Sequence, residues 1–143
     1  RVPRMLVTTV RPLYADTDQM GVVNHAVALR WFEIARAEWL RRLGYTYREF
    51  EETGHFLPVY DLNIRYHKPA FYDQKLALEA RLEAPGPVRI VFHYRVLDAA
   101  HGTLILEGTT RHAVTGKNGR PRALTPELKA LLQRGLDDQN AAR

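Results

Sequence analysis

The segment Tyr14 to His25, which reads YADTDQMGVVNH, holds two acids, a glycine and a histidine directly before the longest amphipathic stretch of the chain. The 143 residues contain no serine and no cysteine, so the two commonest nucleophiles of acyl transfer are missing. Base or covalent chemistry must therefore rest on carboxylate, His, Tyr, Lys or Thr. A carboxylate beside a donor that stabilises an oxyanion is what ester or thioester hydrolysis requires.

Asp18 is better placed for such chemistry than Asp16. The two acids would face the same way in an extended segment but diverge in a turn, and Gly21 predicts a turn just after Asp18. The same glycine would let the backbone approach a ligand. The run Val22 to His25 then leads into a predicted helix N-terminus, where unpaired N–H groups and the positive end of the dipole favour an oxyanion.

Each of these residues has an ordinary interpretation when taken alone. Asp18 or Asn24 would be only a helix cap, His25 a packed or surface histidine, and Tyr14 a core residue. Their joint spacing is what favours a catalytic site.

The elements that must position this segment follow from the spacing of apolar residues. Val7 to Tyr14 is typical of a strand, and helical spacing from about Ala26 to Leu43 predicts a long helix that Gly44 would end. Thr46 and Gly54 bound a second, short helix.

From Pro58 to about Thr115 the apolar period changes to two, which predicts about four strands joined by hairpins. Thr125 and Pro126 then begin a final helix. This order favours a single α+β domain over residues 1–143, in which an antiparallel sheet curls around one buried helix. A second copy would cover what one helix leaves open, so we expect a homodimer or homotetramer.

Composition narrows the function classes. The net charge is +5, but 17 Arg and 4 Lys are spread along the chain, which argues against nucleic-acid binding and favours steering of a small anionic ligand. The six histidines lack metal-ligand spacing, so we expect no metal.

The absence of cysteine fits a reducing compartment, and no apolar run approaches about 18 residues. We therefore expect a cytoplasmic protein without a membrane partner.

The motif resembles the signature of the 4-hydroxybenzoyl-CoA thioesterase-like branch of the hotdog-fold acyl-CoA thioesterases, which includes bacterial enzymes associated with the Tol-Pal system. The resemblance covers nearly the whole chain. It rests on Tyr14 to Asp18, Gly21-Val22-Val23, His25, Trp31-Phe32-Glu33 with Arg36, Ile64 to Ala70, Asp73, and Gly119-Arg120-Pro121.

The resemblance implies a hotdog fold, a sheet wrapped around a long helix, and hydrolysis of acyl-CoA to a free acid and coenzyme A. It implies no cofactor, since coenzyme A is part of the substrate. Asp18 would act as the nucleophile or as general base for water, and both roles stay open. The backbone N–H of His25 would polarise the carbonyl, with the side chains of His25 and Tyr14 assisting.

Substrate contacts are expected from residues beside the motif, from cations near turns, and from an arginine early in the fourth strand, where relatives often have Ser or Thr. These residues are Gly21, Val22, Val23, Asn24, Lys68, Arg120 and Arg89. Lys117 and Arg122 are further phosphate candidates, although ordinary surface charge explains each cation singly. Two departures from the family pattern matter. Asn24 stands where an aromatic residue is common, and Ala28 where a tyrosine is common, so the preferred acyl group stays open.

Three rival functions remain. A non-catalytic acyl-CoA-binding hotdog domain is the main alternative. A hotdog hydratase or dehydratase would use Asp18 and His25 on the acyl chain, and a nucleic-acid-binding protein would lose affinity steeply with salt.

Overall fold

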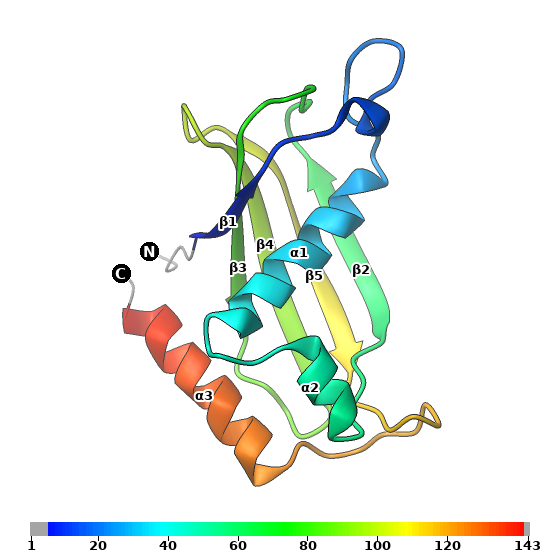
Figure 1. Ribbon diagram of the computed structural model, residues 1–143, viewed down its shortest axis with the longest axis vertical. Coiled ribbons are helices and arrows are strands. Elements are labelled where there is room, and N and C mark those ends of the chain that lie inside the picture. The colour runs from blue at the N-terminus through cyan, green and yellow to red at the C-terminus, as the bar shows by residue number, and fades with distance from the viewer. Residues whose placement is uncertain (1–5, 142–143) are drawn as a thin grey trace.

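The computed structural model describes residues 6–141. Its elements in chain order are β1 Leu6–Val10, the 3-10 turn η1 Tyr14–Asp16, α1 Val27–Arg41, α2 Tyr47–Glu52, β2 Val59–Tyr66, β3 Leu76–Leu82, β4 Arg89–Asp98, β5 Leu104–Ala113 and α3 Pro126–Ala141. Helix α1 lies across one face of the sheet (Figure 1). The loop before α1 lies at the upper end in this view, and α2 and α3 lie at the lower end.

The sheet has the order β1-β3-β4-β5-β2, and all its pairs are antiparallel. Hairpins join β3, β4 and β5, as predicted. The same prediction is wrong for β2, which pairs with β5 at the far edge, so the link from β2 to β3 must cross the sheet. The first strand also ends earlier than predicted, at Val10, because Pro12 has no N–H to donate and the chain then turns through η1.

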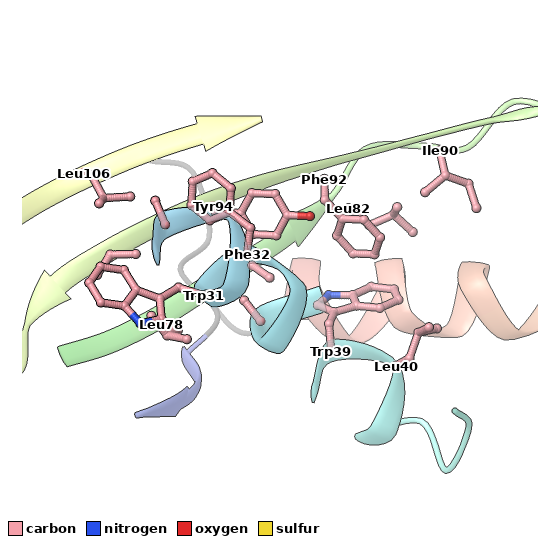
Figure 2. Close-up of a cluster of buried hydrophobic side chains, with 14 of the residues drawn as sticks. Trp31, Phe32, Trp39, Leu40, Leu78, Leu82, Ile90, Phe92, Tyr94 and Leu106 are labelled. Atoms are coloured by element: carbon pink, nitrogen blue, oxygen red, sulfur yellow. The ribbon is translucent and has the colours of Figure 1, made fainter. Parts of the chain in front are cut away.

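The core lies between α1 and the sheet (Figure 2). Trp31, Phe32 and Trp39 on α1 are buried against alternate residues of β3 and β4, which confirms the predicted period of two in these strands. The Phe32 ring stacks on Tyr94 with ring centroids 4.3 Å apart. Gly108 on β5 permits this close packing, since a Cβ there would lie 2.7 Å from the Phe32 ring.

The helix boundaries follow the predicted capping signals. Gly44 and Gly54 have φ values of +77° and +81°, which suit glycine at the ends of α1 and α2. The Thr46 hydroxyl accepts a 3.2 Å hydrogen bond from the Glu49 N–H, and the Thr125 hydroxyl accepts one from the Leu128 N–H at 3.2 Å. Local sequence therefore sets where these helices begin and end.

Helix α3 is tied to the sheet through the buried Gln139. Its Nε2 donates to the Leu82 carbonyl at 2.9 Å, and its Oε1 accepts from the Leu82 N–H at 2.8 Å. The same oxygen accepts from Trp39 Nε1 at 3.2 Å. One amide side chain thus connects α3, β3 and α1.

Candidate active site

The loop before α1 is built around Asp16, a buried carboxylate. Its Oδ2 accepts hydrogen bonds from the Leu13 N–H at 2.8 Å and from Arg30 Nη2 at 2.7 Å, and its carbonyl accepts from the Asn24 N–H at 2.8 Å. Burial alone would raise the pKa of Asp16, but the bonds from Arg30 and Leu13 outweigh it and lower that pKa. Asp16 therefore joins both ends of the loop to α1.

Asp18 lies in the same loop but is exposed. Its Oδ1 accepts from the Met20 N–H at 2.8 Å and the Val22 N–H at 3.1 Å, while Gly21, at φ +77°, donates to the Asp18 carbonyl. Within residues 6–141, Oδ2 of Asp18 accepts no hydrogen bond. One oxygen is thus fixed by the turn, and the other is available to a reacting group.

An apolar pocket of about 270 Å³ adjoins this loop. Its walls come from the loop, from the first two turns of α1, from the end of β2 with the residues that follow, and from β5. The lining residues are Val22, Val23, Asn24, His25, Ala28, Trp31, Tyr66, His67, Lys68, Pro69, Ala70, Ile105 and Leu106. A mostly apolar pocket with a few polar groups at its wall suits an acyl chain that ends in a polar carbonyl.

The amide of His25 lies at the start of α1 on the pocket wall. Asn24 caps the next two amides, because its Oδ1 accepts from the Ala26 N–H at 2.9 Å and its carbonyl accepts from the Val27 N–H at 3.1 Å. In the part of the chain that the structure describes, the His25 N–H has no acceptor. It therefore remains available to a ligand oxygen, next to the positive end of the helix dipole.

The structure gathers five of the predicted site residues in this pocket, namely Val22, Val23, Asn24, His25 and Lys68. Asp18 and Gly21 do not line it, although Asp18 is bonded to the lining residue Val22. Tyr14 is 78% exposed, and its ring meets the edge of Tyr72 at a centroid distance of 5.8 Å. Tyr14 therefore lies outside the pocket in this single chain.

Arg89 and Arg120 lie toward the other end of the sheet. Arg89 pairs with Ala113, seven residues along β5 from the pocket residue Leu106, or about 23 Å at the usual strand rise. Arg120 lies in the turn after β5, where its carbonyl accepts from the Gly116 N–H. A single chain does not bring either arginine to the pocket.

Several pocket residues were not predicted as site residues, among them Trp31, Tyr66 and Leu106. Apolar periodicity identifies Trp31 and Leu106 as core but cannot tell which core residues border a cavity. Trp31 and Tyr66 lie in segments that carry the family resemblance, which was the one available signal.

Residues 6–141 contain no group of three or more His, Cys, Asp or Glu side chains that could hold a metal ion. No helix among them is long and apolar enough to cross a membrane.

Known proteins resemble this chain in sequence. YneP of Bacillus subtilis is 36% identical over 104 residues, which cover 73% of this chain and 75% of YneP. The acyl-CoA thioesterase YbgC of Haemophilus influenzae is 36% identical over 124 residues, which cover 85% of this chain and 89% of that one.

Solved structures agree with the fold. The DHNA-CoA thioesterase of Staphylococcus aureus superposes with a TM-score of 0.85 at 29% identity, covering 95% of this chain and 93% of that one. This similarity confirms the predicted α+β hotdog fold. Residues 12–134 match the Thioesterase-like superfamily, and the chain belongs to that family.

Proposed function

We propose that this protein is an acyl-CoA thioesterase, which uses water to cleave the thioester into a free acid and coenzyme A. The observation that carries the proposal is the His25 N–H, which has no acceptor in the described chain and lies on the wall of an apolar pocket. Asp18 lies on the same loop before α1, and one of its carboxylate oxygens has no described partner. A carboxylate and an oxyanion donor are thus held on one short segment.

In this proposal the thioester carbonyl accepts a hydrogen bond from the His25 N–H. Asp18 either removes a proton from an attacking water, or attacks the carbonyl carbon directly and forms an acyl-aspartyl anhydride, which water then hydrolyses to the free acid and the Asp18 carboxylate. The carbonyl oxygen becomes an oxyanion, and its collapse expels the coenzyme A thiolate, which takes up a proton. A single oxyanion donor of this kind is worth about 2.7–4 kcal/mol in the transition state. Assistance from the His25 and Tyr14 side chains stays a prediction.

The test is release of free thiol from short, long and aromatic acyl-CoAs. Asp18→Asn should abolish turnover with little loss of acyl-CoA affinity, whereas Asp138→Asn, an exposed acid on α3, should behave as the parent. The chain has no cysteine to disturb the readout. No release from any acyl-CoA, with binding intact, would instead support the non-catalytic acyl-CoA-binding domain. Because the proposal needs neither metal nor separate cofactor, activity should survive dialysis against EDTA.

We also propose that the protein works as a homodimer or homotetramer. Leu29 on α1 and Val59 and Leu62 on β2 are each more than 40% exposed, and β2 is an edge strand. Exposed apolar side chains along an open edge favour pairing with a second copy. Such a partner could bring Arg89 or Arg120 to coenzyme A phosphates, which one chain does not.

Sedimentation velocity tests the assembly. The parent should sediment as a dimer or larger, and Leu62→Lys should shift it toward the monomer, while Leu131→Lys on α3 should not. A monomeric parent would contradict the proposal.

Two finer assignments rest on sequence. The motif from Tyr14 to His25 supports a place in the Tol-Pal-associated branch, and the lack of cysteine supports a cytoplasmic location. Fractionation of cells that express a tagged chain would test the location.

A further inference from the structure

Tyr66, the last residue of β2, connects the sheet directly to the start of α1. Its hydroxyl donates a 2.7 Å hydrogen bond to the His25 carbonyl, and the two rings meet edge to face with centroids 4.4 Å apart. Both residues line the same pocket. We propose that Tyr66 is a positioning residue, which holds the His25 amide where a substrate carbonyl can reach it. This inference rests on the proposed thioesterase function.

The turn from His25 to Ala28 makes few other hydrogen bonds, although the residues before it are held in place. The Asn24 N–H donates to the Asp16 carbonyl at 2.8 Å, and the Val23 N–H donates to the Ala70 carbonyl at 2.9 Å. The Ala28 N–H reaches the His25 carbonyl at 3.3 Å, and no side chain caps the helix at Ala26. Asn24 bonds the next two amides, but it belongs to the loop that needs to be held. Tyr66 supplies a bond to this turn from outside the loop and the helix.

This bond fixes the turn relative to the opposite wall of the pocket. Tyr66 pairs with Leu106 across β2 and β5, and Leu106 also lines the pocket. The hydrogen bond therefore holds the His25 amide at a fixed position relative to β2 and β5, the strands that would contact the acyl chain. An oxyanion donor acts only when it lies within hydrogen-bond distance of the developing charge, and a misplacement of about 1 Å can cost 10²-fold in rate.

The hydroxyl, rather than the ring, should carry this role. Tyr66→Phe keeps the ring against His25 and removes only the hydrogen bond. Tyr60→Phe is the matched control, because Tyr60 lies on the same strand, is 55% exposed, and its hydroxyl has no hydrogen bond within residues 6–141.

The experiment measures steady-state hydrolysis and amide hydrogen exchange in the parent and both variants. We expect Tyr66→Phe to lower kcat about tenfold, with KM and the affinity for a non-hydrolysable acyl-CoA thioether changed by less than about twofold. Exchange at the amides of residues 25–28 should become several times faster. Tyr60→Phe should match the parent in every measurement.

Parent-like kcat and exchange in Tyr66→Phe would overturn the inference. A lower melting temperature with raised KM and unchanged kcat would also overturn it, because that pattern indicates packing alone. If the parent hydrolyses no acyl-CoA, the proposed function fails, and the exchange measurement still decides whether Tyr66 holds the His25 turn.

Discussion

The Asp16 carboxylate and the Arg30 guanidinium form a 2.7 Å ion pair that fastens the loop before α1 to the helix. Asp16 is 6% exposed, whereas Asp18, two residues later, is exposed and keeps one oxygen without a described partner. The two acids of the motif therefore differ in burial and in hydrogen bonding. The first is committed to structure, and the second is available for chemistry.

Replacing Asp16 should destabilise the protein. Asp16→Asn removes the ion pair and weakens the bond from Leu13, which should lower the free energy of unfolding by about 1.5–3 kcal/mol. Because the fold lowers the pKa of Asp16 below 3.8, its contribution is present above that value and is lost as the pH falls through the lower folded value. Urea titrations at several pH values check both effects. If the free energy of unfolding of Asp16→Asn fell at acid pH in the same way as that of the parent, Asp16 would not be the source of this pH dependence.

His112 should make stability depend on pH in a second window. It is fully buried, its Nδ1 donates to the Leu57 carbonyl at 3.0 Å, and its Nε2 accepts from the Thr110 hydroxyl at 2.8 Å. Burial lowers the pKa of His112 to about 4; the bond to Leu57 opposes this effect, and the positive charge of Arg36 adds to it. The folded state thus resists protonation of this ring.

The unfolded chain binds that proton near pH 6.5, so stability should fall as the pH drops from about 6.5 toward about 4. The full effect corresponds to about 3 kcal/mol. NMR titration should show His112 neutral at pH 5, and His112→Gln should flatten the slope, whereas His101→Gln in an exposed turn should not. A His112 that titrates near pH 6.5 would refute this prediction.

Gly108 should tolerate no side chain. In Gly108→Ala the new Cβ would collide with the Asn63 carbonyl oxygen on β2 and would lie 2.7 Å from the Phe32 ring, so the strands or the helix must move. Overpacking of this kind costs about 1–3 kcal/mol. Thermal unfolding of Gly108→Ala should begin well below that of Gly86→Ala, whose Cβ would meet only the Arg89 carbonyl at 4.0 Å. Equal melting temperatures would show that the packing around Gly108, between Phe32 and Asn63, is looser than described.

Ala28 should limit the size of the acyl group. It is buried on the pocket wall, so Ala28→Val adds two methyl groups to a pocket of about 270 Å³. We expect kcat/KM to fall about tenfold for long or aromatic acyl-CoAs and by less than about twofold for acetyl-CoA. Ala37→Val, at a helix position outside this pocket, serves as control. The same loss for every acyl group would indicate that Ala28 does not set specificity.

Sequence patterns predicted most of the elements and the β3-β4-β5 hairpins, but not the partner of β2. Period-two spacing identified the buried faces of β3 and β4, and capping residues located the helix ends, because these signals are local. The pairing of β2 with β5 joins strands that are distant in sequence, and no local pattern encodes it.

The site shows the same limit. The segment from Asp18 to His25 was predicted because it is contiguous in sequence, and the resemblance supplied the role of Asp18. The bond from Tyr66 to His25 joins residues 41 apart and left no trace in the spacing. Arg89 was predicted as a phosphate contact from its charge and its place early in the fourth strand, and the sheet places it near the opposite end.

The Gln139 amide also decides how the sheet can grow. It occupies both backbone groups of Leu82, three residues past Glu79, which pairs with Leu6, the first residue that the structure describes. Among the described residues, an incoming strand would find five residues of β1 at that edge, whereas β2 offers eight at the other. Strand addition is therefore favoured at the β2 edge. If the β2 strands of two copies pair around a twofold axis, neither edge remains open to a third copy. By occupying the backbone groups of Leu82, Gln139 therefore disfavours the growth of an open-ended fibre through both edges of the sheet.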